Sequence, residues 1–416
     1  MNREKAVLIS HLPKHGLPED PEIHDLAVAA NYEIVHEFKY RGSKIDRMNF
    51  LPQSWLEDLQ FELEEKQYDL IIVNKSLSPM QVSNLETHFE RRVLDKIMLV
   101  LEIFDKKAST KEVKLQIELA NLLYTYPRAQ SSLQRNLMSE RQARMMGRGE
   151  QLKDIVESNV RHRVAKLRKK IEELERQGLS RKEGEAVKIP IVGFYSAGKS
   201  TLFNILVGED IQDVHHEAFT TMFAKTSRTK IFGYPVDLLD TVGLVDLPRN
   251  VLNAFNQMLK PIMTARVIVI VFDSSLDLSI FEDQLKYVRR IFTTSEETVP
   301  RKFLVILSKV DLASKVQIEE KRRILSEEEW LGGSETRIMK TRMDDPDCIR
   351  SKFVENFEFL MSDEIIEFSF VGVHPRNLTK FYDWCRVDDV QWHDDGTCTV
   401  KGKTTRDWFI KLNRLD

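Results

Sequence analysis

The sequence predicts an α/β protein with an N-terminal α/β domain, a helical hairpin and a second α/β domain with a doubly wound, mostly parallel sheet. Two observations support this. Apolar runs suited to strands alternate with helical stretches in the first hundred residues, and again from residue 187 onward. Between these regions lie two long segments with apolar residues at helical spacing. The later strands are apolar throughout, as in a sheet covered on both faces.

Composition places the chain among globular proteins with two or three domains. Of its 416 residues, 42% are hydrophobic and 31% are charged, and the formal net charge is −3. A uniformly basic nucleic-acid binder is therefore excluded, although local basic patches remain possible. The three cysteines have no C-x-x-C spacing, which indicates a reducing compartment. With no apolar run long enough to span a membrane, we expect no membrane partner and a cytoplasmic location, with mitochondria as the alternative.

Residues 1–107 form the predicted N-terminal domain. The segments Ala6–Ser10 and Leu70–Val73 have the composition of strands, and Trp55–Lys66 and Met80–Arg91 have that of helices. This alternation predicts a small α/β domain.

Residues 108–180 form the predicted helical hairpin. Apolar residues recur at helical spacing over Lys111–Tyr124 and over about Glu150–Gln177. The segment Pro127–Gly149 between them has no clear period and is rich in arginine. We therefore expect two antiparallel helices joined by an Arg-rich loop.

The P-loop domain is expected over residues 187–386. Its predicted strands are Val187–Val192, Val236–Leu239, Val267–Phe272, Phe303–Leu307 and Ile365–Phe368. Residues 312–361 are highly charged, and we interpret them as an insertion into this domain. Residues 387–416 are expected to form a small hairpin-containing appendage, because Asp394-Asp-Gly396 separates two short apolar runs.

The most informative motif runs from Gly193 to Ser200 and fits G-x-x-x-x-G-K-[ST]. It lies between a predicted strand and a predicted helix, which is the setting of a phosphate-binding loop. Lys199 is expected to contact the β- and γ-phosphates, and Ser200 to bind Mg²⁺. The nucleotide-binding residues predicted here are Gly193, Tyr195, Ser196, Ala197, Gly198, Lys199, Ser200 and Thr201.

Two further motifs are predicted to contact the γ-phosphate and Mg²⁺. Thr221 lies in the loop after the P-loop helix, and Asp240-Thr-Val-Gly243 follows an apolar strand. Asp240 and Thr221 are expected to join Ser200 as metal ligands, and the Gly243 backbone N–H to sense the γ-phosphate. Lys199, Thr221 and Gly243 are the predicted catalytic residues.

Base recognition is predicted at two later strand ends. Asp311 in Ser308-Lys309-Val310-Asp311 can accept both hydrogen bonds of the guanine edge, while the Lys309 stem packs on the base. Ser369-Phe370 follows the last predicted strand, where a backbone N–H could contact guanine O6. In this order, the motifs predict a Ras-like P-loop GTPase domain with GTP as substrate and GDP as product.

Three residues depart from the usual G-protein pattern. Ser308 replaces the usual Asn and is expected to weaken the bracing between base loop and P-loop. Phe370 replaces a small Ala and could reshape the base pocket. Leu244 stands where Ras-like enzymes place a water-orienting Gln, so unassisted hydrolysis should be slow.

Several segments resemble the HflX family of ribosome-associated GTPases. They are Asp240–Pro248, Ser78–Glu86, Leu101–Asp105 and Lys114–Ala120. Gly147–Glu150 resembles the family's glycine-rich loop, although it lacks the usual proline and several glycines.

The resemblance covers about residues 65 to 385 and implies a partner. That partner is the large ribosomal subunit and its RNA, in ribosome splitting, rescue or biogenesis, with the protein acting as a monomer. Arg135, Arg141 and Arg144 of the hairpin loop are the RNA contacts we expect. Two alternatives stay open: a nucleotide-dependent binding module with negligible turnover, or a GTPase regulating a non-ribosomal protein through the charged insertion.

Overall fold

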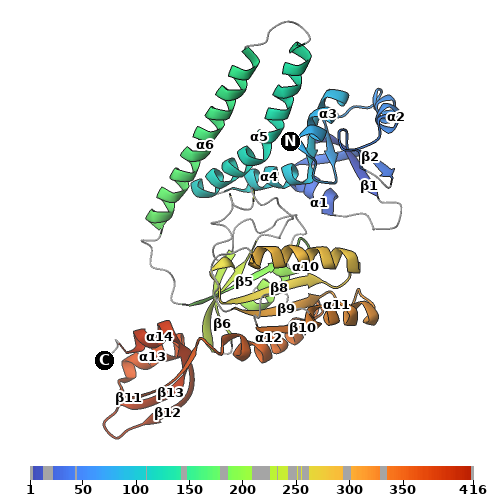
Figure 1. The fold of residues 1–416 in the computed structure, drawn as a ribbon. Coiled ribbons are helices and arrows are strands. Elements are labelled where there is room, and N and C mark those ends of the chain that lie inside the picture. Colours follow the sequence, from blue (N-terminus) through green and yellow to red (C-terminus); the bar gives the residue numbers. More distant parts are fainter. Residues whose placement is uncertain are drawn as a thin grey trace. The chain divides into compact units, whose positions relative to one another are not determined.

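The computed structural model confirms the mixed α/β fold (Figure 1). It describes residues 3–12, 22–42, 45–108, 110–141, 148–178, 186–208, 225–231, 233–241, 251, 254, 262–293, 301–327 and 335–413. The chain divides into two compact units, one built mainly from residues 1–181 and the other mainly from residues 182–416. Within the described residues, no helix has both the length and the apolar character needed to cross a bilayer.

The first unit begins with a four-stranded parallel sheet in the order β2-β1-β3-β4. Its strands are β1 (Glu4–Leu12), β2 (Tyr32–Arg41), β3 (Leu70–Val73) and β4 (Arg92–Asp95). Its helices are α1 (Glu22–Ala29), α2 (Gln53–Leu63), α3 (Pro79–Phe89) and α4 (Lys96–Lys107). The strands and helices predicted in this region are confirmed.

Local sequence explains where two of these helices begin. Ser78 and Gln81 form a capping box at the start of α3, in which each side chain bonds the other's backbone N–H. Asp95 caps α4 by accepting a hydrogen bond from the Met98 N–H at 2.9 Å. The same carboxylate also accepts bonds from the Leu77 N–H at 3.0 Å and the Tyr124 hydroxyl at 2.6 Å. Asp95 therefore joins the segment just before α3 to α4 and to the helix that follows α4.

The helical hairpin consists of α5 (Lys111–Arg141) and α6 (Arg148–Gly178). Figure 1 shows the two as an antiparallel pair. The predicted Arg-rich loop is wrong over much of its length, since α5 continues past Pro127 as far as Arg141. Proline has no N–H to donate and usually ends a helix, but here the helix continues through it. Arg135 and Arg141 therefore lie on α5, and Arg144 falls outside the described residues.

The second unit contains a six-stranded sheet in the order β10-β9-β8-β5-β7-β6. The strands are β5 (Val187–Gly193), β6 (Lys225–Ile231), β7 (Tyr234–Asp240), β8 (Val267–Asp273), β9 (Lys302–Ser308) and β10 (Glu335–Lys340). All pairings are parallel except that of the edge strand β6 with β7. Every residue of β7, β8 and β9 is buried, as expected for a sheet with helices on both faces.

Helices pack on each face of this sheet. They are α7 (Lys199–Val207), α10 (Leu278–Thr293), α11 (Lys315–Glu327) and α12 (Pro346–Met361). On one face, α7 and α12 share a core with the strands through residues such as Phe203 and Phe353. On the other face, Phe281 of α10 contacts Phe272 of β8 at a ring distance of 5.2 Å.

The segment 312–361, expected to be an insertion, belongs to the sheet domain itself. It contains α11, the edge strand β10 and α12, and β10 pairs in parallel with β9. The expectation was wrong because β10 has few buried residues and α11 is mostly charged on its exposed face. A strand at a sheet edge lacks the long apolar run by which the central strands were found.

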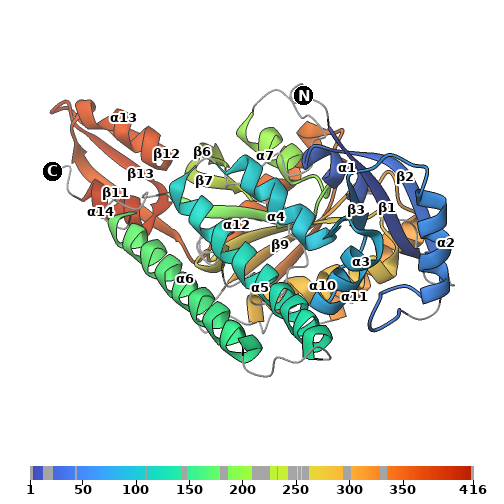
Figure 2. The same cartoon turned by 90° about the horizontal axis from the view of Figure 1, so that it is seen from above.

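The chain ends in a three-stranded antiparallel sheet, ordered β11-β13-β12. Its elements are β11 (Ile365–Val373), α13 (Pro375–Trp384), β12 (Arg386–Trp392), β13 (Cys398–Thr405) and α14 (Arg406–Leu412). Both views place α13 and α14 along this sheet (Figures 1 and 2), and their residues share its core. The strand predicted at Ile365–Phe368 exists, but it lies in this sheet rather than in that of the P-loop domain.

Candidate functional site

The predicted P-loop connects β5 to α7 through a tight turn. A Cβ added at Gly193 would lie 2.4 Å from the Val271 carbonyl oxygen, so only glycine allows β5 to approach β8 here. Ser196 and Gly198 have φ values of 54° and 93°, in the left-handed region. Tyr195 is half-buried in this turn, and Ala197 is buried. This is the backbone shape by which successive N–H groups can face an anion.

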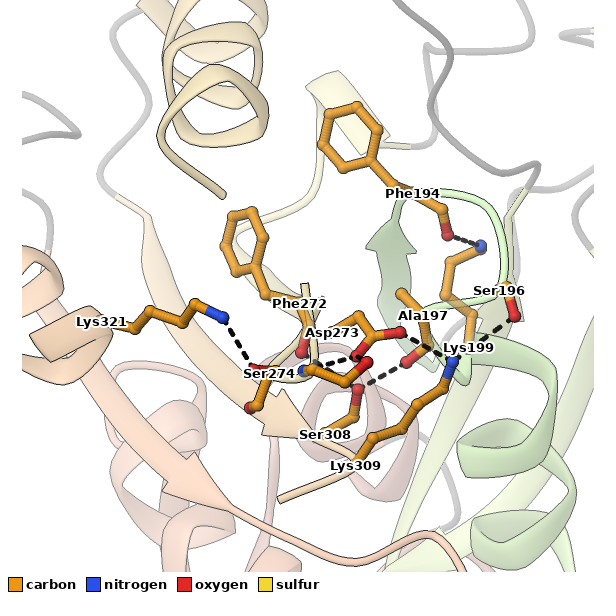
Figure 3. Close-up of polar contacts among 11 residues, drawn as sticks. Phe194, Ser196, Ala197, Lys199, Phe272, Asp273, Ser274, Ser308, Lys309 and Lys321 are labelled. Carbon is orange, nitrogen blue, oxygen red and sulfur yellow. Dashed lines mark hydrogen bonds and ion pairs between the residues drawn. The ribbon is translucent and has the colours of Figure 1, made fainter. Parts of the chain in front are cut away.

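Lys199, the first residue of α7, lies across this turn (Figure 3). It is only 8% exposed, and its Nζ donates to the Phe194 carbonyl at 2.7 Å. Its ammonium and the N-terminus of α7 thus contribute positive charge to one short loop. The arrangement suits the phosphates of a nucleotide.

Two of the three predicted metal ligands lie together. The Ser200 hydroxyl in α7 donates to Asp240 Oδ2 at the end of β7, at 2.7 Å, and Asp240 is buried. Thr201 follows in α7 and is half-buried. Hydroxyl and carboxylate oxygens are ligands that Mg²⁺ accepts in proteins. Thr221, Gly243 and Leu244 lie outside the described residues.

Ser308 connects the predicted base loop to the P-loop. It ends β9 and is fully buried, with its hydroxyl 2.8 Å from the Ala197 carbonyl and 3.0 Å from the Phe272 carbonyl. We expected the short serine to weaken the bracing between these loops, but the structure has a direct contact. A one-carbon side chain suffices because the Ala197 carbonyl lies close to the end of β9.

Lys309 is held by an aspartate that sequence reasoning missed. Its Nζ forms an ion pair with Asp273 Oδ2 at 2.7 Å and lies 3.5 Å from the Ser196 hydroxyl (Figure 3). Asp273 is buried at the end of β8. Like Asp240, it directly follows an apolar strand, and that position is the signal that could have revealed it. Asp311, two residues after Lys309, is exposed to solvent.

A buried lysine supports the same end of β8. Lys321 of α11 is fully buried, and its Nζ donates to the Ser274 carbonyl at 2.7 Å and also to that of Leu276. Burial lowers the pKa of Lys321, and the nearby carboxylates of Asp273, Asp277 and Glu320 partly offset this. Lys321 therefore fixes the loop that follows Asp273.

The structure does not bring Ser369 and Phe370 to the predicted base pocket. Both lie within β11, where Ser369 pairs with Lys401 and Phe370 with Val400 of β13. The Phe370 ring contacts three other phenylalanines, at 368, 381 and 409, in the core of the C-terminal sheet. Placing these two residues after the last strand of the P-loop sheet was therefore wrong.

The turn Thr341–Met343 occupies the position that follows the last strand of the P-loop sheet. It comes directly after β10, and the Thr341 N–H donates to the Leu307 carbonyl at 3.0 Å. A Cβ added at Gly198 would lie 3.1 Å from the Met343 side chain. The hydrogen bond to Asp344 raises the pKa of Arg342, and the Asp311 carboxylate adds to this rise. The turn is thus next to both the P-loop and Asp311.

Three family models match consecutive parts of the chain. They are described as GTP-binding GTPase N-terminal, over residues 20–105, GTP-binding GTPase Middle Region, over 107–184, and 50S ribosome-binding GTPase, over 188–309. The crystal structure of a complex of SsGBP and GDP has a similar fold, with a TM-score of 0.50 and 20% identity. It covers 86% of this chain, which in turn covers 99% of that structure.

Curated relatives identify the family. A GTPase HflX of Thermococcus kodakarensis is 31% identical over 312 residues, which are 74% of this chain and 70% of the relative. A GTPase HflX of Thermofilum pendens is 28% identical over 425 residues, covering 99% of this chain and 96% of the relative. The relatives and the P-loop site agree, so the chain belongs to the HflX family and is a GTPase that binds GTP.

Proposed function

We propose that this GTPase binds its nucleotide together with Mg²⁺ and, in its GTP state, associates with the large ribosomal subunit. The contact between Ser200 and Asp240 beside Lys199 carries the first part of the proposal. Ser200 and Asp240 would hold the ion, joined by Thr221. Bound Mg²⁺ would neutralise charge on the β- and γ-phosphates as the γ-phosphate leaves.

The chain's own residues divide the remaining work. Lys199 supplies a fixed positive charge to the phosphates, and the Gly243 backbone N–H would contact the γ-phosphate and be released when it leaves. Leu244 has no polar atom with which to orient water, so turnover without a partner should be slow.

Base recognition would combine three strand ends. The Asp311 carboxylate would accept from the guanine N1–H and N2–H groups, and the Lys309 stem, fixed by Asp273, would pack against the ring. The turn Thr341–Met343 would take the part first assigned to Ser369 and Phe370, because it lies next to Asp311. Adenine offers no matching pair of donors, which favours guanine.

The ribosomal partner is supported by family membership and by the helical hairpin. The model matching the P-loop domain is described as a 50S ribosome-binding GTPase, and α5 and α6 extend over 31 residues each. The alternative of a non-ribosomal protein partner relied on a charged insertion. Its support is lost because residues 312–361 are part of the sheet domain.

Co-sedimentation with purified large subunits tests the proposal directly. We expect binding with a non-hydrolysable GTP analogue, weaker binding with GDP, and phosphate release that rises when subunits are added. Removing Mg²⁺ should lower affinity for GTP in the absence of ribosomes. Equal sedimentation with and without GTP analogue, or none in any state, would contradict the ribosomal part without affecting nucleotide binding.

A further inference from the structure

The edge strand β2 of the N-terminal sheet is paired with a neighbouring strand on one side. It stands first in the order β2-β1-β3-β4, and within the described residues β1 is its one partner strand. At ten residues it is longer than most strands, and it contains no proline. A long strand at the edge of a sheet presents a row of N–H and C=O groups with which another chain can pair.

The second half of β2 is regular. The pairing with β1 shifts by one residue between Ala6 and Val7, which makes Val35 an extra residue in β2. From His36 to Arg41 the register with β1 is continuous. Bulges hinder the pairing of edge strands with other chains, but this bulge leaves the half of β2 that follows it unchanged.

Side chains of this half alternate between the two faces of the sheet. Phe38 and Tyr40 pack against the core that the sheet shares with α2. His36 lies two residues before Phe38, so its side chain belongs to the same face. Glu37 and Lys39 belong to the other face, where Glu37 Oε1 and Lys39 Nζ are 3.7 Å apart. One face of this edge therefore has three rings, and the other has one acid and one base.

The segment His36-Glu-Phe-Lys-Tyr40 is complementary to itself when two copies run antiparallel. If Phe38 lies opposite Phe38 of the second copy, then Glu37 lies opposite Lys39. In the same register His36 lies opposite Tyr40. Each pair occurs twice, and directly opposite residues share a face, so ion pairs form on one face and ring contacts on the other. Sliding by the two residues that keep the faces would instead place Glu37 or Lys39 opposite itself, and like charges at such positions are destabilising.

We infer that β2 is a self-association edge, at which two copies of this chain pair antiparallel about a two-fold axis at Phe38. The four-stranded sheets of the two copies then join into one continuous sheet. Charged side chains on an edge strand usually keep other strands away. Here they match a second copy of the same strand and do not match a strand of arbitrary sequence. The dimer takes the place of the monomer expected from the family resemblance.

Charge reversal tests this pairing. Glu37→Lys alone places lysine opposite lysine across the two-fold axis, and Lys39→Glu alone places glutamate opposite glutamate. The double variant restores opposite charges, and so does a mixture of the two single variants. Glu33→Lys is the matched control, because Glu33 is exposed on the same strand but precedes the bulge. Circular dichroism and GDP affinity verify that each variant is folded.

Sedimentation velocity of the full chain at several concentrations measures the assembly. Wild type and the control should approach twice the monomer mass as the concentration rises. Each single reversal should weaken dimerisation about tenfold or more, because two attractive pairs become repulsive. The double variant should dimerise as wild type does, and the two single variants should form dimers when they are mixed in equal amounts.

Three results would overturn the inference. Wild type could stay monomeric at every concentration, which would show that the edge does not pair. Dimers that Glu37→Lys leaves intact would be held by another surface. If the mixture of single variants stayed monomeric, opposite charges would not face each other at β2. These measurements involve neither GTP hydrolysis nor ribosomes, so a failure here is distinct from a failure of the proposed function.

Discussion

In each of the two α/β sheets of this protein, a strand ends in an aspartate, and the two aspartates have different partners. In the four-stranded sheet, Asp95 at the end of β4 accepts hydrogen bonds from Leu77, Met98 and Tyr124. In the six-stranded sheet, Asp240 at the end of β7 contacts Ser200 in the phosphate-binding turn. The same position in a strand thus serves architecture in one sheet and ligand binding in the other. The glycine turn after β5 makes the difference.

Replacing each aspartate separately by alanine should give the largest effects. One variant should lose stability and the other should lose ligand binding. Asp95→Ala leaves two buried N–H groups and a hydroxyl without their acceptor, so the free energy of unfolding should fall by about 3 kcal/mol. GDP affinity of the folded protein should stay unchanged. Asp240→Ala should instead abolish the Mg²⁺ dependence of GTP binding, with little change in the free energy of unfolding. Urea unfolding measures the stability of each variant, and calorimetry measures its nucleotide affinity. If both variants lost stability and affinity to the same extent, the two aspartates would not have different roles.

Lys199→Ala tests the ligand-binding side alone. Charge-assisted contacts contribute roughly 1.5–3 kcal/mol, so GTP affinity should fall at least tenfold. Calorimetric titration with GTP measures this, and Lys309→Ala provides a comparison at the base rather than the phosphates. Equal GTP affinities for wild type and Lys199→Ala would show that this loop does not bind the phosphates.

Lys321 stabilises the loop that follows β8, next to the predicted nucleotide site. Lys321→Met should lower the free energy of unfolding by about 1–2 kcal/mol, because two carbonyls lose their donor. Burial lowers the native pKa of Lys321, so between that value and the ordinary 10.5 the unfolded chain binds more protons. Wild-type stability relative to Lys321→Met should therefore rise with pH across this window. Urea unfolding at several pH values measures the difference, and a constant difference would mean that the native pKa is not lowered.

Ser308→Ala should have the smallest effect. The buried hydroxyl makes one net hydrogen bond to the Ala197 or Phe272 carbonyl, which is worth about 1 kcal/mol. We expect GDP to dissociate several-fold faster because the base loop and P-loop are less firmly joined. Stopped-flow release of a fluorescent GDP analogue measures this rate. An unchanged rate would show that the contact of Ser308 with the P-loop does not affect GDP binding.

The P-loop and its neighbours could be predicted because their signals are local. Fixed glycine and lysine spacing places the turn, and continuous apolar runs identify β7, β8 and β9. Asp240, Ser308 and Lys309 follow directly from those strand ends. The described structure brings these residues together as their positions in the sequence imply.

The errors arose where the signal was not local. A charged edge strand such as β10 has one buried face, so its sequence resembles a surface segment. An apolar run such as Ile365–Phe368 shows that a strand exists but not which sheet it joins, and so Ser369 and Phe370 were misplaced. Pro127 indicated a helix end that the packing of α5 overrides.

The pairing of β6 with β7 has a mechanical consequence. Arg228 and Asp237 lie directly opposite each other and form a bidentate ion pair, at 2.8 and 3.0 Å. Near the far end of the hairpin, Lys230 donates to the Tyr382 carbonyl of α13 at 2.9 Å. Side chains of a strand alternate between the two faces of a sheet. If β6 slid along β7, it would have to move by two residues, about 7 Å, to keep each side chain on its own face.

Such a step would break the ion pair of the hairpin and detach its far end from α13. The Arg228–Asp237 ion pair and the Lys230 contact therefore hold β6 and β7 in one register, and β7 is also paired with β5 on its other side. β6 begins four residues after Thr221, and β7 ends at Asp240. A displacement of the strand pair that ends at Asp240 would therefore strain the contact between Lys230 and α13, which belongs to the C-terminal part of the chain.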